Sequence, residues 1–144
     1  MPVRTAILIV STSVSRRADP DEIGPALAAQ VEEAGAEVVG IEVVPHDYAL
    51  LEDRMHHFVE DDCGLILTAG GIGVDPDHVT PEATRAVIDR ELPGVQEAIR
   101  AADPELLLSR GVAGLAGAAL VVNLPGTTLG ARRAFEVLTP LVRA

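Results

Sequence analysis

The 144-residue sequence has no lysine, no tryptophan and a single cysteine, and its aromatic residues are limited to two phenylalanines and one tyrosine. One cysteine, Cys63, excludes an internal disulfide and fits a reducing compartment, where we expect it as a small core residue. Aromatic residues make up 2% of the chain and apolar residues 48%, so the core must consist of Ala, Val, Leu and Ile. The length predicts one domain, residues 1–144, large enough to bury such a core.

Long apolar runs are missing as well. No run approaches the length of a membrane-spanning helix, and the first residues lack the charged segment and apolar core of a signal peptide, so we expect a cytoplasmic protein without membrane contact. The formal net charge is −11, and all eleven basic residues are arginine. This acidity argues against nucleic acid as a partner, because phosphates would be repelled over most approaches. An anionic ligand would need a local pocket of backbone N–H groups and arginines.

Short apolar segments alternate with amphipathic ones along the chain. The expected strands, which are apolar and lack helical spacing, are residues 6–10, 38–43, 65–68 and 120–123. The expected helices are residues 25–34, 47–61, 80–91, 94–102 and 130–141. Thr80 should cap the third of these helices, with Pro81 at its first helical position. Residues 106–126 contain two apolar runs around small residues, which predicts a hairpin.

This alternation predicts an α/β fold with a mainly parallel sheet covered by helices. We find no linker, low-complexity segment or internal repeat in the sequence. Ligands of such sheets bind beyond the carboxyl ends of the strands. The loops that follow predicted strands, and are therefore candidates for a site, are residues 11–24, 45–47, 69–80 and 125–129.

The segment LTAGGIGVDPDHVTPEAT, residues 67–84, is the most informative of these loops. Its three glycines can adopt backbone angles that let their N–H groups converge on an anion. The segment is not a phosphate-binding Walker loop, because Gly-Lys-Ser/Thr is absent, and its glycines do not open a helix directly. The glycines alone fit equally well a turn that merely leaves the strand. Asp75, Asp77 and His78 favour a polar site, which could hold Mg²⁺.

The segments GGxG, VTPEAT, DRELPG, EAIR, LSRGVAG and LVVNLPG, in this order, resemble the MoaB/Mog family, the molybdopterin adenylyltransferases. The resemblance covers essentially the whole chain and implies a three-layer α/β sandwich and a homotrimer. It also implies transfer of AMP from Mg-ATP to the terminal phosphate of molybdopterin, with release of pyrophosphate. This step belongs to molybdenum cofactor biosynthesis, so other proteins of that process become possible partners.

Two departures from the family pattern fall at positions associated with catalysis. Where the family has aspartate before Val-Thr-Pro, this chain has His78, preceded by Asp77. Where the family has aspartate after the proline of the second strand, this chain has His46, followed by Asp47. Aspartate is a hard oxygen ligand for Mg²⁺, whereas histidine prefers softer metals or donates to phosphate. We therefore expect the two imidazoles to share one pocket beside the glycine turn, with Mg²⁺-dependent transfer weakened.

The resemblance also assigns roles to individual residues. It implies catalytic roles for His46, Asp47, Asp77, His78 and Glu82. It implies Mg²⁺ ligation by Asp47 and Asp77, if these neighbours replace the missing aspartates. It implies contacts with ATP or molybdopterin from Ser11, Gly70, Gly71, Gly73, Ser109, Pro125, Gly126 and Thr127.

The residues leave several interpretations open. Arg110 fits a partner for phosphate and a surface ion pair equally well. The chain is either an adenylyltransferase or a non-catalytic molybdopterin-binding or assembly protein of the same fold, and the two histidines are what separates these functions. A nucleotide pyrophosphatase is a weaker third interpretation.

Overall fold

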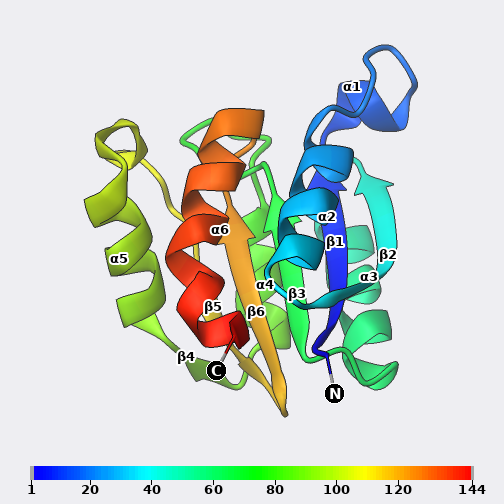
Figure 1. Ribbon diagram of the computed structural model, residues 1–144. Coiled ribbons are helices and arrows are strands. Elements are labelled where there is room, and N and C mark those ends of the chain that lie inside the picture. The colour runs from blue at the N-terminus through cyan, green and yellow to red at the C-terminus, as the bar shows by residue number, and fades with distance from the viewer. Residues whose placement is uncertain (1, 144) are drawn as a thin grey trace.

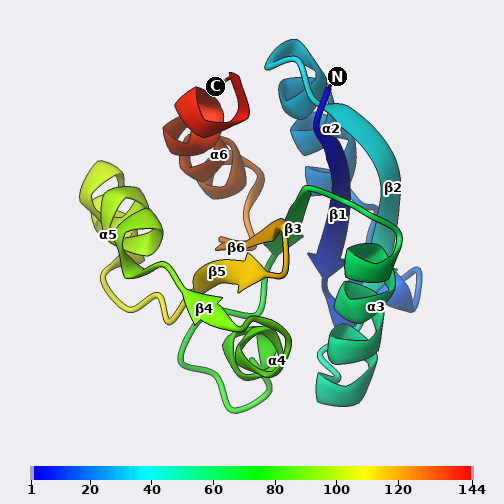
Figure 2. The same cartoon turned by 90° about the horizontal axis from the view of Figure 1, so that it is seen from below.

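The computed structural model describes residues 2–143 and contains one six-stranded sheet between two layers of helices (Figures 1 and 2). The strands are β1 (Arg4–Val10), β2 (Glu37–Val44), β3 (Leu65–Ala69), β4 (Arg90–Glu91), β5 (Ala113–Ala116) and β6 (Ala119–Leu124). The helices are α1 (Thr12–Ser15), α2 (Ile23–Glu33), α3 (Tyr48–Glu60), α4 (Thr80–Val87), α5 (Pro93–Ala102) and α6 (Thr128–Arg143), with a 3₁₀ turn η1 (Pro104–Leu106). No helix between residues 2 and 143 is long and apolar enough to cross a bilayer.

The sheet has the order β2-β1-β3-β6-β5-β4, and its first four strands are parallel. β5 is antiparallel to β6, because a tight hairpin joins them, and β4 at the edge is antiparallel to β5 and so runs in the same direction as the first four strands. The four predicted strands, the mainly parallel sheet and a hairpin within residues 106–126, formed by β5 and β6, are therefore confirmed. The predicted helix 80–91 is too long, because the backbone is already extended at Ile88 and Arg90–Glu91 form β4. Sequence reasoning also missed η1 and the short α1, which lies in a stretch predicted as a loop.

Side chains of the parallel strands alternate between two apolar cores, one on each face of the sheet. On one face, Ile7 and Ile9 of β1 pack in a core with residues of α2, α5 and α6, including Phe135. On the other face, Ala6 and Leu8 pack in a core with residues of α3 and α4. Figure 2 shows this separation of the helices into two layers. Because both faces of the sheet are covered, β1, β3 and β6 are mostly apolar and buried, as the sequence predicted.

The predicted capping role of Thr80 is wrong. Helix α4 begins at Thr80 itself, with Val79 at the cap position and no side-chain cap. The backbone N–H of Thr80 donates to the carbonyl oxygen of Gly71 at 3.3 Å, and the residue is fully buried. This contact with the glycine turn, rather than a local cap, sets the start of the helix.

Candidate functional site

The loops after the parallel strands enclose an open pocket of about 780 Å³ at the carboxyl ends of the sheet. Each of the four predicted loops contributes to its lining, which confirms the expectation that they converge. The first of these loops contributes residues 20–23 at the start of α2, and a further wall comes from Glu105, Leu106, Leu108 and Ser109, at and after η1. All eight residues predicted to contact ATP or molybdopterin line this pocket.

The glycine turn that leaves β3 is tightly packed beneath the pocket. Gly70 and Gly71 have positive φ values, 113° and 72°, which residues with a side chain rarely adopt. A Cβ at Gly70 would overlap the carbonyl oxygen of Val10, and one at Gly71 would overlap the hydroxyl of Thr80. The N–H of Gly70 donates to Leu124 at 3.0 Å, whereas the N–H of Gly71 makes no hydrogen bond within residues 2–143. The turn therefore keeps one backbone N–H, that of Gly71, without a partner among these residues.

His46 and His78 meet in the pocket although they come from different loops. Their rings are stacked, with centroids 5.0 Å apart and planes at 22°. Both side chains line the pocket beside the glycine turn. The prediction that the two imidazoles share one pocket is thus confirmed. The two rings meet because β2 and β3 are parallel, so the loops that follow them lie at the same end of the sheet, where the strands have their carboxyl ends.

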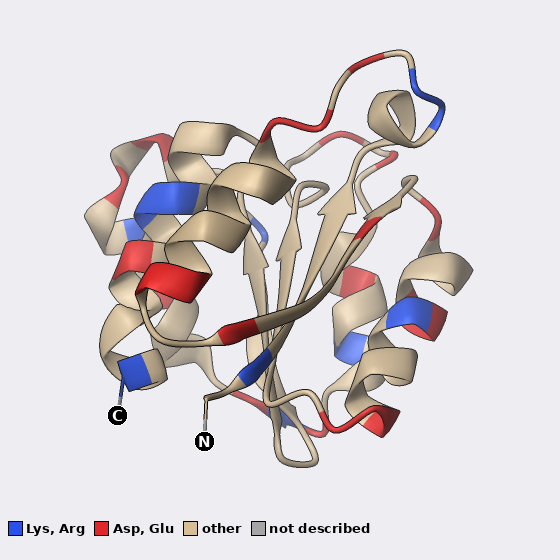
Figure 3. Ribbon diagram, turned by 45° about the vertical axis from the view of Figure 1, so that its right-hand side comes forward, with Lys and Arg blue, Asp and Glu red and all other residues tan. Residues whose placement is uncertain are grey.

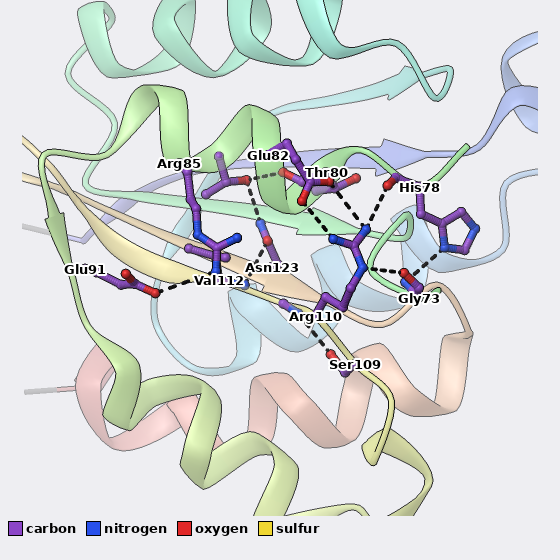
Figure 4. A network of polar contacts seen from close by, with 12 residues as sticks. Gly73, His78, Thr80, Glu82, Arg85, Glu91, Ser109, Arg110, Val112 and Asn123 are labelled. Carbon is purple, nitrogen blue, oxygen red and sulfur yellow. Dashed lines mark hydrogen bonds and ion pairs between the residues drawn. The ribbon is translucent and has the colours of Figure 1, made fainter. Parts of the chain in front are cut away.

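The ring of His78 is held by the turn itself. The backbone N–H of Gly73 donates to His78 Nδ1 at 2.9 Å. Figure 4 shows this bond and shows the other ring nitrogen turned away from the neighbouring network. A nitrogen that accepts a hydrogen bond carries no proton, so the neutral ring has its proton on Nε2.

The ring of His46 is partly buried, and its Nδ1 has no hydrogen-bond partner among the described residues. Burial lowers the pKa of His46, and the neighbouring His78 lowers it further. The carboxylates of Asp77 and Asp75 act in the opposite direction. Because the pKa is below its ordinary value, His46 is neutral near pH 7.

Arg110 fixes the loop that carries His78. Its Nε donates to the carbonyl oxygen of Gly73 and its Nη2 to that of His78, both at 2.8 Å (Figure 4). Its Nη1 forms an ion pair with Glu82 at 2.8 Å, and this hydrogen bond lowers the pKa of Glu82. Neither Arg110 nor Glu82 lines the pocket. Of the two interpretations of Arg110, the ion pair is therefore present, and the guanidinium also binds two carbonyls of the turn.

The two aspartates predicted as Mg²⁺ ligands lie outside the pocket lining. Asp47 is exposed and caps α3, where its Oδ1 accepts from the N–H of Leu50 at 3.0 Å. Asp77 is exposed on the loop, and its N–H donates to Asp75 Oδ1 at 2.9 Å. Within residues 2–143, no three His, Cys, Asp or Glu side chains are grouped closely enough to hold a metal ion. The side chains that lie against the glycine turn include the imidazoles of His46 and His78 and the hydroxyl of Thr80, and imidazole nitrogens do not fit Mg²⁺. Metal ligation by these aspartates stays a prediction.

Two of the predicted contact residues also stabilise the pocket rim. Ser109 Oγ accepts from the N–H of Gly111 at 3.2 Å, and Thr127 Oγ1 accepts from the N–H of Gly130 at 3.0 Å. The second bond caps α6, whose first-turn N–H groups face the end of β6. A helix start of this kind favours an anionic ligand.

A buried polar network behind the site escaped sequence reasoning. Asn123 Nδ2 donates to the hydroxyls of Thr68 and Thr84, each at 2.9 Å, and its Oδ1 accepts from the N–H of Val112 at 3.0 Å. Gln96 donates to the carbonyl oxygens of Val112 and Asn123. The network ties β3, β6, α4 and α5 together, and Figure 4 shows its part around Asn123. A single asparagine in the run LVVNL was the only signal for it.

The pocket is acidic at its mouth. Among residues 2–143, its lining includes the carboxylates Asp21, Glu22 and Glu105 and no arginine. Figure 3 shows acidic residues along the loop between α1 and α2, above the strand ends. Positive potential for an anion therefore has to come from backbone N–H groups and the imidazoles.

Comparison with known proteins places this geometry in context. The sequence model of a family described as "Probable molybdopterin binding domain" matches residues 6–144. The crystal structure of a molybdopterin biosynthesis enzyme, MoaB from Thermus thermophilus, superimposes with a TM-score of 0.92 at 36% identity, covering 98% of this chain and 96% of that one.

Two curated sequences show the range of lengths among the relatives. A Haemophilus influenzae protein named molybdopterin adenylyltransferase is 35% identical over 92% of this chain and 73% of its own length. The Drosophila melanogaster molybdenum cofactor synthesis protein cinnamon is 31% identical over 94% of this chain. The chain spans only 24% of the length of that protein.

Proposed function

The chain belongs to the family of molybdopterin-binding domains, and we propose that it acts in molybdenum cofactor biosynthesis by transferring AMP from ATP to the terminal phosphate of molybdopterin. The observation that supports this proposal is the single pocket lined by all eight predicted contact residues. The relative named molybdopterin adenylyltransferase supports it as well.

The pocket supplies what such a transfer needs from a protein. An oxygen of the pterin phosphate forms a bond to the α-phosphorus of ATP, and the bond from that phosphorus to the pyrophosphate oxygen breaks. Phosphoryl transfer depends on positioning and on stabilisation of charge on the phosphoryl oxygens. The free N–H of Gly71, the first turn of α6 and the imidazoles are the donors for those oxygens.

The fold family implies Mg²⁺ together with ATP. The side chains beside the glycine turn do not fit this ion, because two imidazoles stand where oxygen ligands are required. We therefore derive no step through it, and we expect transfer with Mg²⁺ as the only metal to be slow.

A second function is favoured by the same two histidines. A protein that binds molybdopterin without adenylylating it would keep the pocket and lose the aspartates. In either case we propose a homotrimer, which light scattering would show as three times the chain mass of 15.0 kDa. Other molybdenum cofactor biosynthesis proteins are the proposed partners.

One experiment separates the two functions. The purified chain is incubated with molybdopterin and α-labelled ATP, and adenylylated pterin and pyrophosphate are quantified alongside calorimetric binding of molybdopterin. Formation of both products supports the transferase, and binding without products supports the binding protein. Replacing both pocket histidines with alanine should lower the rate about 10²-fold, as expected for lost transition-state donors. The variant His56→Gln, on the exposed face of α3, is the matched control and should keep the rate.

A further inference from the structure

His78 is built as a hydrogen-bond donor rather than a metal ligand. Its Nδ1 accepts from the N–H of Gly73 at 2.9 Å, which leaves the proton of the neutral ring on Nε2. A protonated ring nitrogen has no lone pair to give to a metal. Arg110 holds this arrangement, because its guanidinium binds the carbonyl oxygens of both Gly73 and His78.

His46 reaches the same state through a different neighbour. Its Nδ1 and the hydroxyl of Thr80 are both buried without a hydrogen-bond partner among the described residues. Both lie against Gly71: a Cβ built there would overlap the hydroxyl and approach the Nδ1 to 3.2 Å. No hydrogen bond joins the two atoms in the structure, so a proton on Nδ1 would be buried without an acceptor. The proton of His46 is then also on Nε2.

Both Nε2 atoms remain available to a ligand. Neither is buried without a partner nor hydrogen-bonded within residues 2–143, and both rings line the pocket. The stacked rings, with centroids 5.0 Å apart, therefore place both Nε2 atoms in the same pocket. The free N–H of Gly71 is a third donor beside them.

We propose that the pair of His46 and His78 binds the oxygens of a phosphate monoester through the two Nε2–H groups, in the place where its family uses a divalent cation. This inference rests on the proposed function, because it concerns the same pocket. It makes phosphate binding by this chain independent of metal. The carboxylates of Asp21, Glu22 and Glu105 line other parts of the wall, and those of Asp75 and Asp77 flank His78 in the sequence. Because these carboxylates repel an anion, the two N–H donors have to contact the phosphate oxygens directly.

The first test is an NMR titration of the ¹⁵N-labelled chain with inorganic phosphate. In the free protein both rings should show a protonated Nε2 and an unprotonated Nδ1. Phosphate added in the presence of EDTA should shift both Nε2 signals, and its Kd should change less than about twofold when Mg²⁺ replaces EDTA. Shifts that need Mg²⁺, an Nδ1-protonated ring, or direct binding of Zn²⁺ or Mn²⁺ to the rings would overturn the inference.

Variants separate a donor from a merely structural side chain. His46→Ala should weaken phosphate binding about tenfold, the effect of one lost hydrogen bond to a charged group. His46→Gln retains an N–H donor near Nε2 and should restore binding to within about threefold of the wild type. His56→Gln is again the matched control and should bind as the wild type does. Equal losses in His46→Ala and His46→Gln would contradict a donor role.

Replacing both histidines with aspartate, the residue that the family has at these positions, tests directly whether the imidazoles take the place of the cation. His46→Asp combined with His78→Asp should abolish phosphate binding in EDTA and restore it with Mg²⁺. Metal-free binding by this double variant would overturn the inference.

The outcome is separable from the fate of the proposed function. If phosphate binds only with Mg²⁺ while AMP transfer is observed, the inference fails and the transferase stands. If phosphate binds in EDTA and no AMP transfer occurs with any metal, the inference stands and the transferase fails.

Discussion

Two arginine–glutamate pairs in this protein use the same chemical groups for different purposes. Arg54 directs Nε and Nη2 to the two carboxylate oxygens of Glu42, at 2.7 and 2.8 Å, and so fastens α3 to β2. Arg110 gives Glu82 one short bond of 2.8 Å and a longer one of 3.4 Å, and its Nε and Nη2 also donate to the carbonyl oxygens of Gly73 and His78. Both pairs are partly exposed, at 26% and 32% for the first and 37% and 43% for the second.

The difference shows that exposure and pairing alone do not reveal what an ion pair does. Partly exposed pairs contribute little to stability, and Arg54 lies over the ring of Phe58 as part of ordinary surface packing. Arg110 has similar exposure, yet it determines where the ring of His78 lies. Arg110 therefore acts by positioning the loop that carries His78. Replacing Arg110 should mainly lower activity, whereas replacing Arg54 should affect only stability.

The largest expected effect is that of Arg110→Ala on AMP transfer. Loss of the two carbonyl contacts frees the loop that carries His78, and misplacement of a reacting group by about 1 Å lowers rates about 10²-fold. The matched variant Arg54→Ala should leave the rate unchanged and lower the free energy of unfolding by at most about 1 kcal/mol. Initial rates and urea unfolding of both variants give the comparison. Equal rates in the two variants would contradict the positioning role of Arg110.

Asn123→Ala should do the opposite of Arg110→Ala, with its main effect on stability. The change leaves the N–H of Val112 buried without a partner and removes two hydrogen bonds to threonine hydroxyls. We expect the free energy of unfolding to fall by about 2–3 kcal/mol, measured by urea titration. A thermal transition that stays at the wild-type temperature would show that the network contributes nothing.

A smaller effect is expected for Glu82→Gln. The amide oxygen still accepts from Arg110, so the guanidinium keeps its place while the ion pair loses its charge. The AMP transfer rate should change less than about threefold, because an exposed pair contributes under about 1 kcal/mol. A loss comparable with that of Arg110→Ala would make Glu82 part of the reaction itself.

The smallest expected effect is on the stability of the fold at low pH. Arg110 lowers the pKa of Glu82, and Arg54 likewise lowers the pKa of Glu42, each below the ordinary value of 4.5. A carboxyl with a lowered folded-state pKa stabilises the fold above pH 4.5, and this stabilisation is lost as the pH falls through the folded-state value. Unfolding curves between about pH 7 and about pH 3 should therefore show a smaller acid loss in Glu42→Gln and in Glu82→Gln than in the wild type. Glu42→Gln and Glu82→Gln should reduce the acid loss to a similar extent, because both carboxylates are paired with an arginine.

The sequence predicted the sheet and the location of the pocket because both follow from apolar periodicity and parallel topology. The meeting of His46 and His78 could be predicted for the same reason, since each follows a parallel strand. The role of Arg110 could not, because two of its partners are backbone carbonyls, which have no signature in sequence. Asp47 was interpreted as a metal ligand although its position, one residue before α3, is also that of a helix cap. Local capping and catalysis select the same residue types there, and only the structure separates them.

The pairing of β3 with β6 makes the glycine turn depend on the last strand of the chain. Leu65 of β3 pairs with both Thr5 of β1 and Leu120 of β6, so both pairings of β3 join residues far apart in the sequence. In contrast, β1 and β2 pair across the shorter stretch from Arg4 to Glu37. Contacts between residues far apart in the chain form slowly, because loop closure precedes any gain from pairing. The hydrogen bond from Gly70 to Leu124 forms only when β6 docks. Because β6 is synthesised after β1–β3, we expect the glycine turn to gain this support, and the pocket to bind its ligand, only once β6 has been added to the sheet.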